Sequence, residues 1–156
     1  MKFNLSKLFP SLLLPFTVGM SSGYLTYSGI SNWYAYLTPP PLTPPNWVFA
    51  PVWTTLYLMM GLSLYLFWDN RKKIDKGRGY LIFIFGLIVN FSWSLLFFSV
   101  HSPLLALIDI IILIALIIAN IMLFKPVSKT SAYLLIPYLL WVCFATYLNL
   151  GFLLLN

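Results

Sequence analysis

Five long runs of apolar residues dominate the sequence and decide which class of protein it can form. They cover approximately residues 8–28, 47–68, 80–100, 104–124 and 132–155. Each run has about the 20 residues that an α-helix needs to cross a hydrocarbon core of about 30 Å. Strands of a membrane barrel would instead show short segments of alternating hydropathy, and none is visible. The sequence therefore predicts an all-α membrane protein, a five-transmembrane-helix bundle in which residues 1–156 form a single domain.

The positions of the basic residues give an independent test of this helix count. All nine Lys and Arg residues fall in the N-terminal segment, between the second and third runs, or between the fourth and fifth runs. Five spans place these three segments on one side of the membrane, which the positive-inside rule makes the cytoplasmic side. We therefore expect a multi-pass protein of the cell membrane with a cytoplasmic N-terminus. The proline-rich loop between the first two helices and the C-terminus then lie on the outer side.

Composition excludes several classes of function. The net charge of +6 is explained by topology and by contact with the headgroups of the lipid bilayer, so we expect no nucleic-acid partner. One histidine, one cysteine and one carboxylate within the spans do not build a typical metal site, so we expect no metal. The sequence contains no P-loop, no dinucleotide fingerprint and no Ser/His/Asp arrangement. A conventional hydrolase, kinase or metalloenzyme is therefore not expected.

The segment that links the first two runs is rich in proline and leads into an aromatic helix. Residues 33–68 contain four of the six tryptophans and six of the eleven prolines. Prolines at positions 39–41, 44 and 45 fix φ and donate no backbone hydrogen bond, so they predict a stiff extended connector. Thr43, which precedes two prolines, is the predicted cap of the second helix. A rigid loop followed by an aromatic helix is typical of the lid and wall of a cavity for large planar molecules.

Two polar side chains lie deep in the predicted spans. A carboxylate such as Asp109 must face protein or water, because its insertion into a bilayer centre costs about 2.5–3.5 kcal/mol. It is either a ligand or proton contact, or a structural hydrogen-bond partner of a tyrosine or of Asn90 on a neighbouring helix. Asn90 itself is either an interhelical hydrogen-bond partner or a polar contact to a ligand. Trp93 follows Asn90 at i+3 and therefore shares its helix face.

Two residue pairs, each with a tryptophan, stand at helical spacing. Trp53 and Tyr57 are separated by four residues on the second helix, and Trp141 and Ala145 by four on the fifth. Tryptophans near span ends usually anchor the protein at the membrane interface, but Trp53 and Trp141 lie deeper. For these two, core packing and ligand contact both remain open.

Small residues and prolines mark further features of the helices. The Gly19 and Gly23 pair has the GxxxG spacing and predicts close helix packing, either within the bundle or in a dimer. Pro137 predicts a kink in the fifth helix. Ser102 and Pro103 predict the N-cap and first residue of the fourth.

The sequence resembles the TspO/translocator protein family, also known as tryptophan-rich sensory proteins or the peripheral-type benzodiazepine receptor, and is similar to bacterial members. The resemblance rests on Trp33-Tyr34, on PPNWVFAPVW, on NFSWSLLFF, on Asp109 and on PYLLWVCFATYLN. It implies a compact bundle, commonly a homodimer, with a ligand cavity under the first loop. The family binds porphyrins and other tetrapyrroles such as protoporphyrin IX, sterols in some members, and synthetic isoquinoline carboxamide and benzodiazepine drugs. No cofactor is implied, because porphyrin is the ligand or substrate.

The resemblance also implies a set of ligand-binding residues, to which the spacing arguments add Tyr57 and Asp109. The full set is Tyr34, Pro44, Trp53, Tyr57, Asn90, Trp93, Asp109, Ile110, Trp141 and Ala145. Some bacterial members degrade protoporphyrin in light, which makes Trp53 and Trp141 candidate catalytic residues. Specific cholesterol recognition is not expected, because no basic residue follows Tyr147 as the proposed cholesterol motif requires.

Three functions remain open at this point. The protein binds tetrapyrroles as a sensor, carrier or regulator, or it catalyses their light-dependent breakdown, or it transports porphyrin or lipid. The sequence shows no inverted repeat and no coupling site, which counts against transport. We expect binding. Because the predicted cavity offers no Lys or Arg, the propionates of a bound porphyrin are expected near water, close to His101 and to the starts of the second and fourth helices.

Overall fold

The computed structural model describes residues 4–70, 72 and 75–156 and confirms a bundle of five helices long and apolar enough to span a membrane. The first span is α1 (Leu5–Asn32), which a short 3-10 turn, η1 (Tyr34–Tyr36), follows. The second span is α2 (Asn46–Asp69). The third is α3 (Gly77–Ser94), which continues as a π-helical turn, η2 (Leu95–Ser99). The fourth is α4 (Pro103–Phe124), and the fifth consists of α5 (Lys129–Leu134) and α6 (Ile136–Leu155). Three of the basic residues that predict the cytoplasmic side, Lys2, Arg71 and Lys73, lie outside the described residues.

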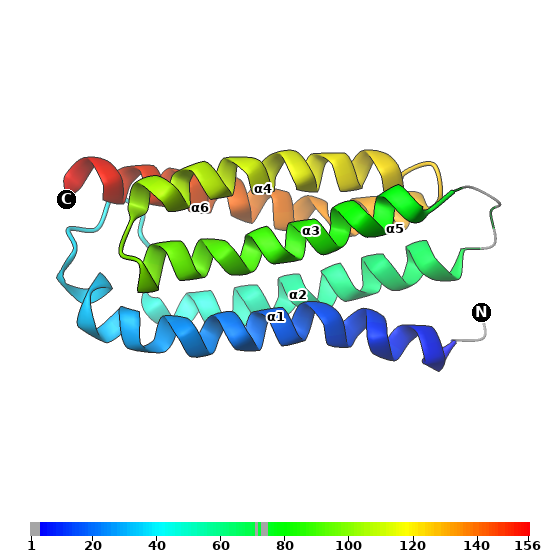
Figure 1. Ribbon diagram of the computed structural model, residues 1–156, viewed down its shortest axis with the longest axis horizontal. Coiled ribbons are helices and arrows are strands. Elements are labelled where there is room, and N and C mark those ends of the chain that lie inside the picture. Colours follow the sequence, from blue (N-terminus) through cyan, green and yellow to red (C-terminus); the bar gives the residue numbers. More distant parts are fainter. Residues whose placement is uncertain (1–3, 71, 73–74) are drawn as a thin grey trace.

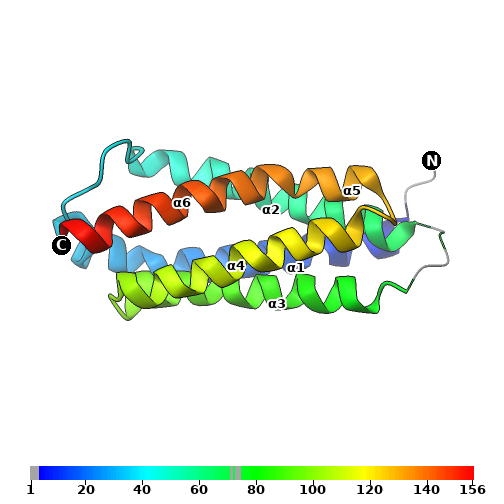
Figure 2. The same cartoon turned by 90° about the horizontal axis from the view of Figure 1, so that it is seen from above.

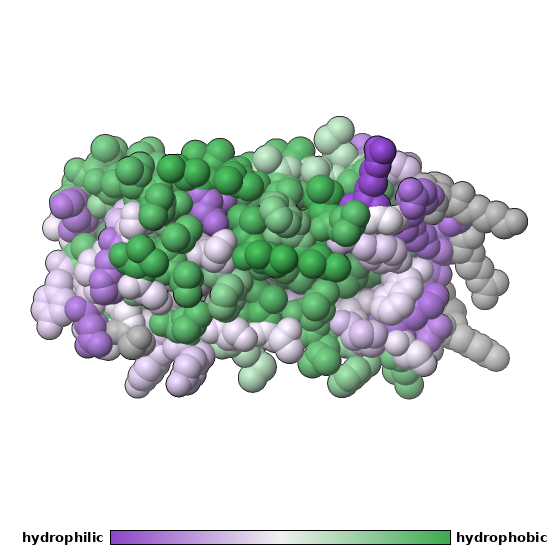
Figure 3. Space-filling view, in the orientation of Figure 1, coloured by the Kyte–Doolittle hydropathy of each residue, from purple (hydrophilic) through white to green (hydrophobic). Residues whose placement is uncertain are grey.

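The helices run along the long axis of the molecule, so that connections gather at its two ends (Figures 1 and 2). The start of α1, the α2–α3 connection and the α4–α5 connection lie at one end, which we call the basic end. Every described Lys and Arg belongs to these segments or to the adjoining helix turns. The proline loop, the α3–α4 turn and the C-terminus lie at the opposite end, the loop end. Between the two ends, the face of the molecule seen in Figure 3 is predominantly apolar.

The helix boundaries follow from proline and serine chemistry, with one correction. As predicted, Ser102 caps α4, since its Oγ accepts a 3.3 Å hydrogen bond from the Leu105 amide, and Pro103 is the first helical residue. The prediction that Thr43 caps α2 is wrong. The helix begins at Asn46 without a side-chain cap, and the Thr43 hydroxyl donates to the Pro40 carbonyl instead (2.7 Å). The residue before a proline is disfavoured in the helical region, and Thr43 and Pro44 both precede a proline, so the helix starts after the second proline of the pair.

Pro137 interrupts the fifth span, which confirms the predicted kink. The helical segments α5 and α6 meet at Leu135, whose amide donates to the Ala132 carbonyl at 3.2 Å. Proline lacks the N–H that would continue the ladder, and the break falls at Leu135, two residues before it. Pro10 and Pro15 in α1 and Pro51 in α2 lie within helices that continue past them.

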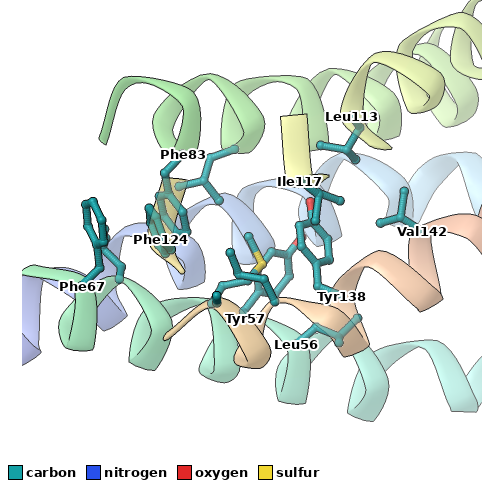
Figure 4. Packing of buried hydrophobic residues seen from close by; sticks show 14 of the residues in the cluster. Leu56, Tyr57, Phe67, Phe83, Leu113, Ile117, Phe124, Tyr138 and Val142 are labelled. Carbon is teal, nitrogen blue, oxygen red and sulfur yellow. The ribbon is translucent and has the colours of Figure 1, made fainter. Parts of the chain in front are cut away.

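The interior of the basic half is closely packed with aromatic and aliphatic side chains (Figure 4). Phe67 of α2 stacks on Phe124 of α4 with ring centroids 3.9 Å apart. Gly79 of α3 makes room for Phe67, because a Cβ there would lie 2.6 Å from its ring. This half of the bundle has a solid core.

Polar contacts tie the helices of the basic half together. Ser63 of α2 and Ser131 of α5 each donate to the other's backbone carbonyl, at 2.7 and 2.6 Å. Lys7 of α1 forms a 3.1 Å ion pair with Asp69 of α2. Reciprocal hydroxyl bonds of this kind satisfy polar groups that lipid leaves unpaired.

The two glycines of the GxxxG pair have different surroundings. A Cβ on Gly19 would lie 2.4 Å from the Tyr57 ring, so Gly19 allows α1 and α2 to approach closely within the bundle. A Cβ on Gly23 would meet no atom within 4 Å. Of the two alternatives for this pair, the structure shows bundle packing at Gly19.

Candidate ligand-binding cavity

A cavity of about 310 Å³ lies in the loop half of the bundle. Its walls come from α1, η1, α2, α3, η2 and α6, whereas none of the described residues of α4 lines it. The volume is at the lower end of the range for small-molecule sites. The bundle is therefore solid toward the basic end and hollow toward the loop end.

The structure brings seven of the ten predicted site residues together on this cavity. They are Tyr34, Trp53, Tyr57, Asn90, Trp93, Trp141 and Ala145. They come from four separate elements along the chain, η1, α2, α3 and α6, so the cavity exists only in the folded bundle. Ligand contact by these residues stays a prediction, but their common location is a property of the fold.

Asn90 connects the cavity wall to the core by hydrogen bonds. Its Oδ1 accepts from the Tyr57 hydroxyl at 2.9 Å, and its Nδ2 donates to the Tyr138 hydroxyl at 3.1 Å. The side chain is 3% exposed. The interhelical hydrogen bond predicted as one alternative is therefore present, and it links α2, α3 and α6. Because Asn90 also lines the cavity, the ligand contact remains the second prediction for the same amide.

Stacked aromatic rings form two faces of the cavity. Trp53 stacks on Tyr57 with centroids 5.5 Å apart and planes 27° apart. Trp93 stacks on Phe97 at 5.4 Å and 18°. Pairs like these are rigid and present flat apolar surfaces. The π-helical turn helps to form the second face, because both Phe97 and Phe98 line the cavity from it.

Asn149 is a cavity residue that the sequence analysis did not select. Its Oδ1 accepts from the Trp93 indole N–H at 3.0 Å, and its Nδ2 donates to the Pro103 carbonyl at 2.7 Å. It is 1% exposed. The signal was present in the helical spacing, since Asn149 lies four residues after Ala145 and eight after Trp141 on the same face of α6.

Two polar groups on the cavity have no hydrogen-bond partner among the described residues. They are Nε1 of Trp141 on α6 and Oγ of Ser22 on α1, and both atoms are buried. A buried donor without an acceptor is costly. No Lys, Arg, His, Asp or Glu is among the residues that line the cavity. The cavity therefore suits an uncharged, largely apolar group.

Three predicted site residues do not line the cavity. Asp109 lies on α4, where its Oδ1 accepts a 2.6 Å hydrogen bond from the Ser92 hydroxyl of α3. The structural alternative is thus present, with Ser92 in place of the expected tyrosine or Asn90. Ile110 is 2% exposed in the core. Pro44 lies in the proline loop, none of whose residues 37–45 reaches the cavity.

His101 also lies outside the cavity wall. Its ring stacks on Trp33 with centroids 4.8 Å apart and planes 18° apart. Of the two expected helix starts, only that of α2 reaches the cavity, through Asn46.

This combination of five membrane-spanning helices, a proline loop and an aromatic cavity defines a small helical membrane protein with an internal cavity. Residues 11–155 match the TspO/MBR family, so the chain belongs to that family.

Curated relatives agree with this assignment. The chain is 41% identical over 153 residues to the tryptophan-rich protein TspO of Archaeoglobus fulgidus, covering 98% of this chain and 99% of that one. It is 41% identical over 140 residues to the TspO of Chlorobaculum tepidum, covering 89% of each. It is 35% identical over 139 residues to the translocator protein of Bos taurus, covering 88% of this chain and 82% of that one. The resemblance seen in the sequence motifs is confirmed.

Proposed function

We propose that the protein binds a tetrapyrrole such as protoporphyrin IX in this cavity and acts as a membrane sensor, carrier or regulator of that ligand. Family membership supports a membrane sensor or translocator role. The observation that carries the finer proposal is the convergence of seven predicted residues on one uncharged aromatic cavity. Planar macrocycles gain most from such a surface, because they bury a large apolar area against rings of fixed orientation.

The charges of the ligand set its orientation in this proposal. The macrocycle stacks between Trp53 and Trp141, where no charged side chain is present. The propionates stay at the loop end beside Asn46, where the first amides of α2 present partial positive charge. Esterified propionates should therefore change affinity little.

The distribution of basic residues also supports an orientation in the cell membrane. We place the basic end in the cytoplasm and the loop end outside, since cytoplasmic segments carry the excess of Lys and Arg. The loop, the cavity and the C-terminus then belong to the outer half of the bilayer. A homodimer remains a prediction from the family resemblance.

Binding is tested by titration of the purified protein with protoporphyrin IX in darkness, followed by tryptophan quenching. Saturable quenching is expected, with weaker binding by Trp53→Phe. Trp47→Phe is the matched control, because Trp47 lies on the same helix, is 74% exposed and does not line the cavity. Absence of saturable quenching in the unmodified protein would remove the proposal.

A second candidate function is light-dependent porphyrin breakdown. It is favoured by one observation, the presence of both Trp53 and Trp141 on the cavity that would hold the porphyrin. In that reaction the excited porphyrin is oxidised, oxygen is the oxidant, and the tryptophans are the redox-active side chains. Illumination of the complex in air should then give a new product spectrum that either Trp53→Phe or Trp141→Phe abolishes. An unchanged porphyrin spectrum would leave binding as the function.

A further inference from the structure

Three residues at the end of the chain, Tyr147 and Gly151 of α6 and the terminal Asn156, contact the proline loop. The Tyr147 hydroxyl donates a 2.9 Å hydrogen bond to the Pro41 carbonyl. Gly151 lies against the ring of Pro40, where a Cβ would come within 2.4 Å of the proline Cβ. The Asn156 side chain pairs with both backbone groups of Thr38, accepting from its amide at 2.7 Å and donating to its carbonyl at 3.2 Å. We call this set of contacts the latch.

The cavity is also sealed from the loop end by aromatic rings. Tyr34 packs on Phe152 with ring centroids 5.1 Å apart, and on Phe98 at 5.7 Å. Trp33 packs edge-to-face on Phe97 at 5.2 Å. Four of these rings, those of Tyr34, Phe97, Phe98 and Phe152, are part of the cavity wall. A ligand arriving through the loop would have to break the latch and separate this cluster.

The side between α1 and α2 has no such closure. Gly23 and Tyr27 of α1 line the cavity and are exposed, and so are Asn46 and Ala50 of α2. Tyr27 is 81% exposed, and the position of a Cβ on Gly23 is open space. The exposed residues that line the cavity thus include members of both α1 and α2, which places an opening of the cavity between these two helices. This opening lies on the flank of the bundle, which acyl chains surround in a bilayer.

We propose that the opening between α1 and α2 is the access route of the ligand, which enters sideways from the membrane while the latch keeps the loop closed. This inference rests on the proposed function and specifies it further. It assigns the ligand to molecules that partition into the bilayer and present an uncharged planar edge first, because no charged residue lines the opening or the cavity. Gly23 is then a gating position, since it keeps the opening wide.

The first test fills the opening and leaves the loop untouched. Gly23→Trp places an indole in the open space, and Tyr24→Trp is the matched control, because Tyr24 is the next residue, is 84% exposed and does not line the cavity. The probe is protoporphyrin IX already dissolved in lipid vesicles that contain the full protein. Association and dissociation measured by tryptophan quenching should both slow about tenfold in Gly23→Trp. Ala50→Phe, with Thr54→Phe as its control, tests the other edge of the opening.

The second test closes the latch covalently. Cysteines at positions 40 and 151, introduced in a Cys143→Ser background, join the loop to α6. Their Cβ atoms need a separation of about 3.8 Å, which requires about 1.4 Å of movement from the 2.4 Å at this contact. The oxidised and reduced forms should bind the porphyrin at the same rate.

The outcomes separate the two proposals. Two results would overturn the lateral route while leaving the function intact. One is slower binding in the oxidised form of the cysteine variant. The other is equal rates for Gly23→Trp and Tyr24→Trp together with equal rates for Ala50→Phe and Thr54→Phe. Absence of saturable binding in every form, including the unmodified protein, would remove the function and the route together.

Discussion

The indole N–H of Trp93 donates a 3.0 Å hydrogen bond to Oδ1 of Asn149 and so joins α3 to α6 at the cavity wall. The other end of the same amide bonds to the backbone carbonyl of Pro103, where α4 begins. One buried side chain thus holds three helices in register and keeps the Trp93 ring in its stacked position. The cavity depends on this polar contact as much as on the aromatic residues that line it.

Replacement of this amide should destabilise the bundle. Asn149→Leu leaves the Trp93 donor unpaired and removes the side-chain bond to the Pro103 carbonyl, at a cost of about 1–3 kcal/mol in the free energy of unfolding. The measurement is thermal unfolding in detergent. Combining it with Trp93→Phe in a double-mutant cycle should give a coupling of at least about 0.5 kcal/mol. Simple additivity of the two changes would show that the bond contributes nothing.

The two glycines of α1 should respond differently to the same added methyl group. Gly19→Ala forces a Cβ to within 2.4 Å of the Tyr57 ring, and the hydrogen bond from Tyr57 to Asn90 limits how far that ring can move. We expect a loss of about 1–3 kcal/mol of stability. Gly23→Ala is the control, since its Cβ meets no atom, and it should be neutral. Equal unfolding temperatures for the two variants would contradict this packing.

The unpaired indole N–H of Trp141 should contribute directly to ligand affinity. Trp141→Phe keeps an aromatic ring but removes the donor, so a porphyrin or other ligand with an acceptor at this position loses about 1 kcal/mol, or about fivefold in affinity. Equilibrium titration in darkness measures this loss. Trp68→Phe, at the end of α2 away from the cavity, should bind as the unmodified protein does. The same loss in Trp68→Phe would mean that the effect is not specific to the site.

The ion pair at the basic end should matter little. Lys7 and Asp69 are each 31% exposed, so solvent screens their attraction. Asp69→Asn should lower stability by less than about 1 kcal/mol, and the difference should vanish at high salt. A larger loss that persists in 1 M salt, where the screening length is about 3 Å, would indicate a buried interaction instead.

The spans were predictable because each depends on local composition. A run of about 20 apolar residues has few alternatives to a membrane helix, and the basic residues fix how many such runs there are. Ser102 and Pro103 likewise determine the start of α4 through contacts within one helical turn. The Thr43 prediction failed for a local reason too, because the restriction that proline imposes on the preceding residue outweighed the capping preference.

Residues of the site were predictable only where the i, i+4 spacing along a helix shows that two side chains share a face. Trp53 and Tyr57, and Trp141 and Ala145, share faces that the fold turns toward the cavity. Asp109 could not be assigned in this way, since its bond to Ser92 depends on how α3 and α4 are rotated against each other. The latch contact between Asn156 and Thr38 joins residues 118 positions apart, and no local sequence pattern predicts it.

The contrast between a solid half and a hollow half has a volumetric consequence. Pressure favours states that eliminate internal voids, and the void of about 310 Å³ is confined to the loop half. Compression of the empty protein should therefore act first on the loop-end turns of α1, α2 and α6, while the stacked phenylalanines around Phe124 resist it. A molecule that fills the void removes this difference in compressibility between the two halves. The resistance of the protein to pressure therefore reports the fraction of molecules whose cavity is occupied.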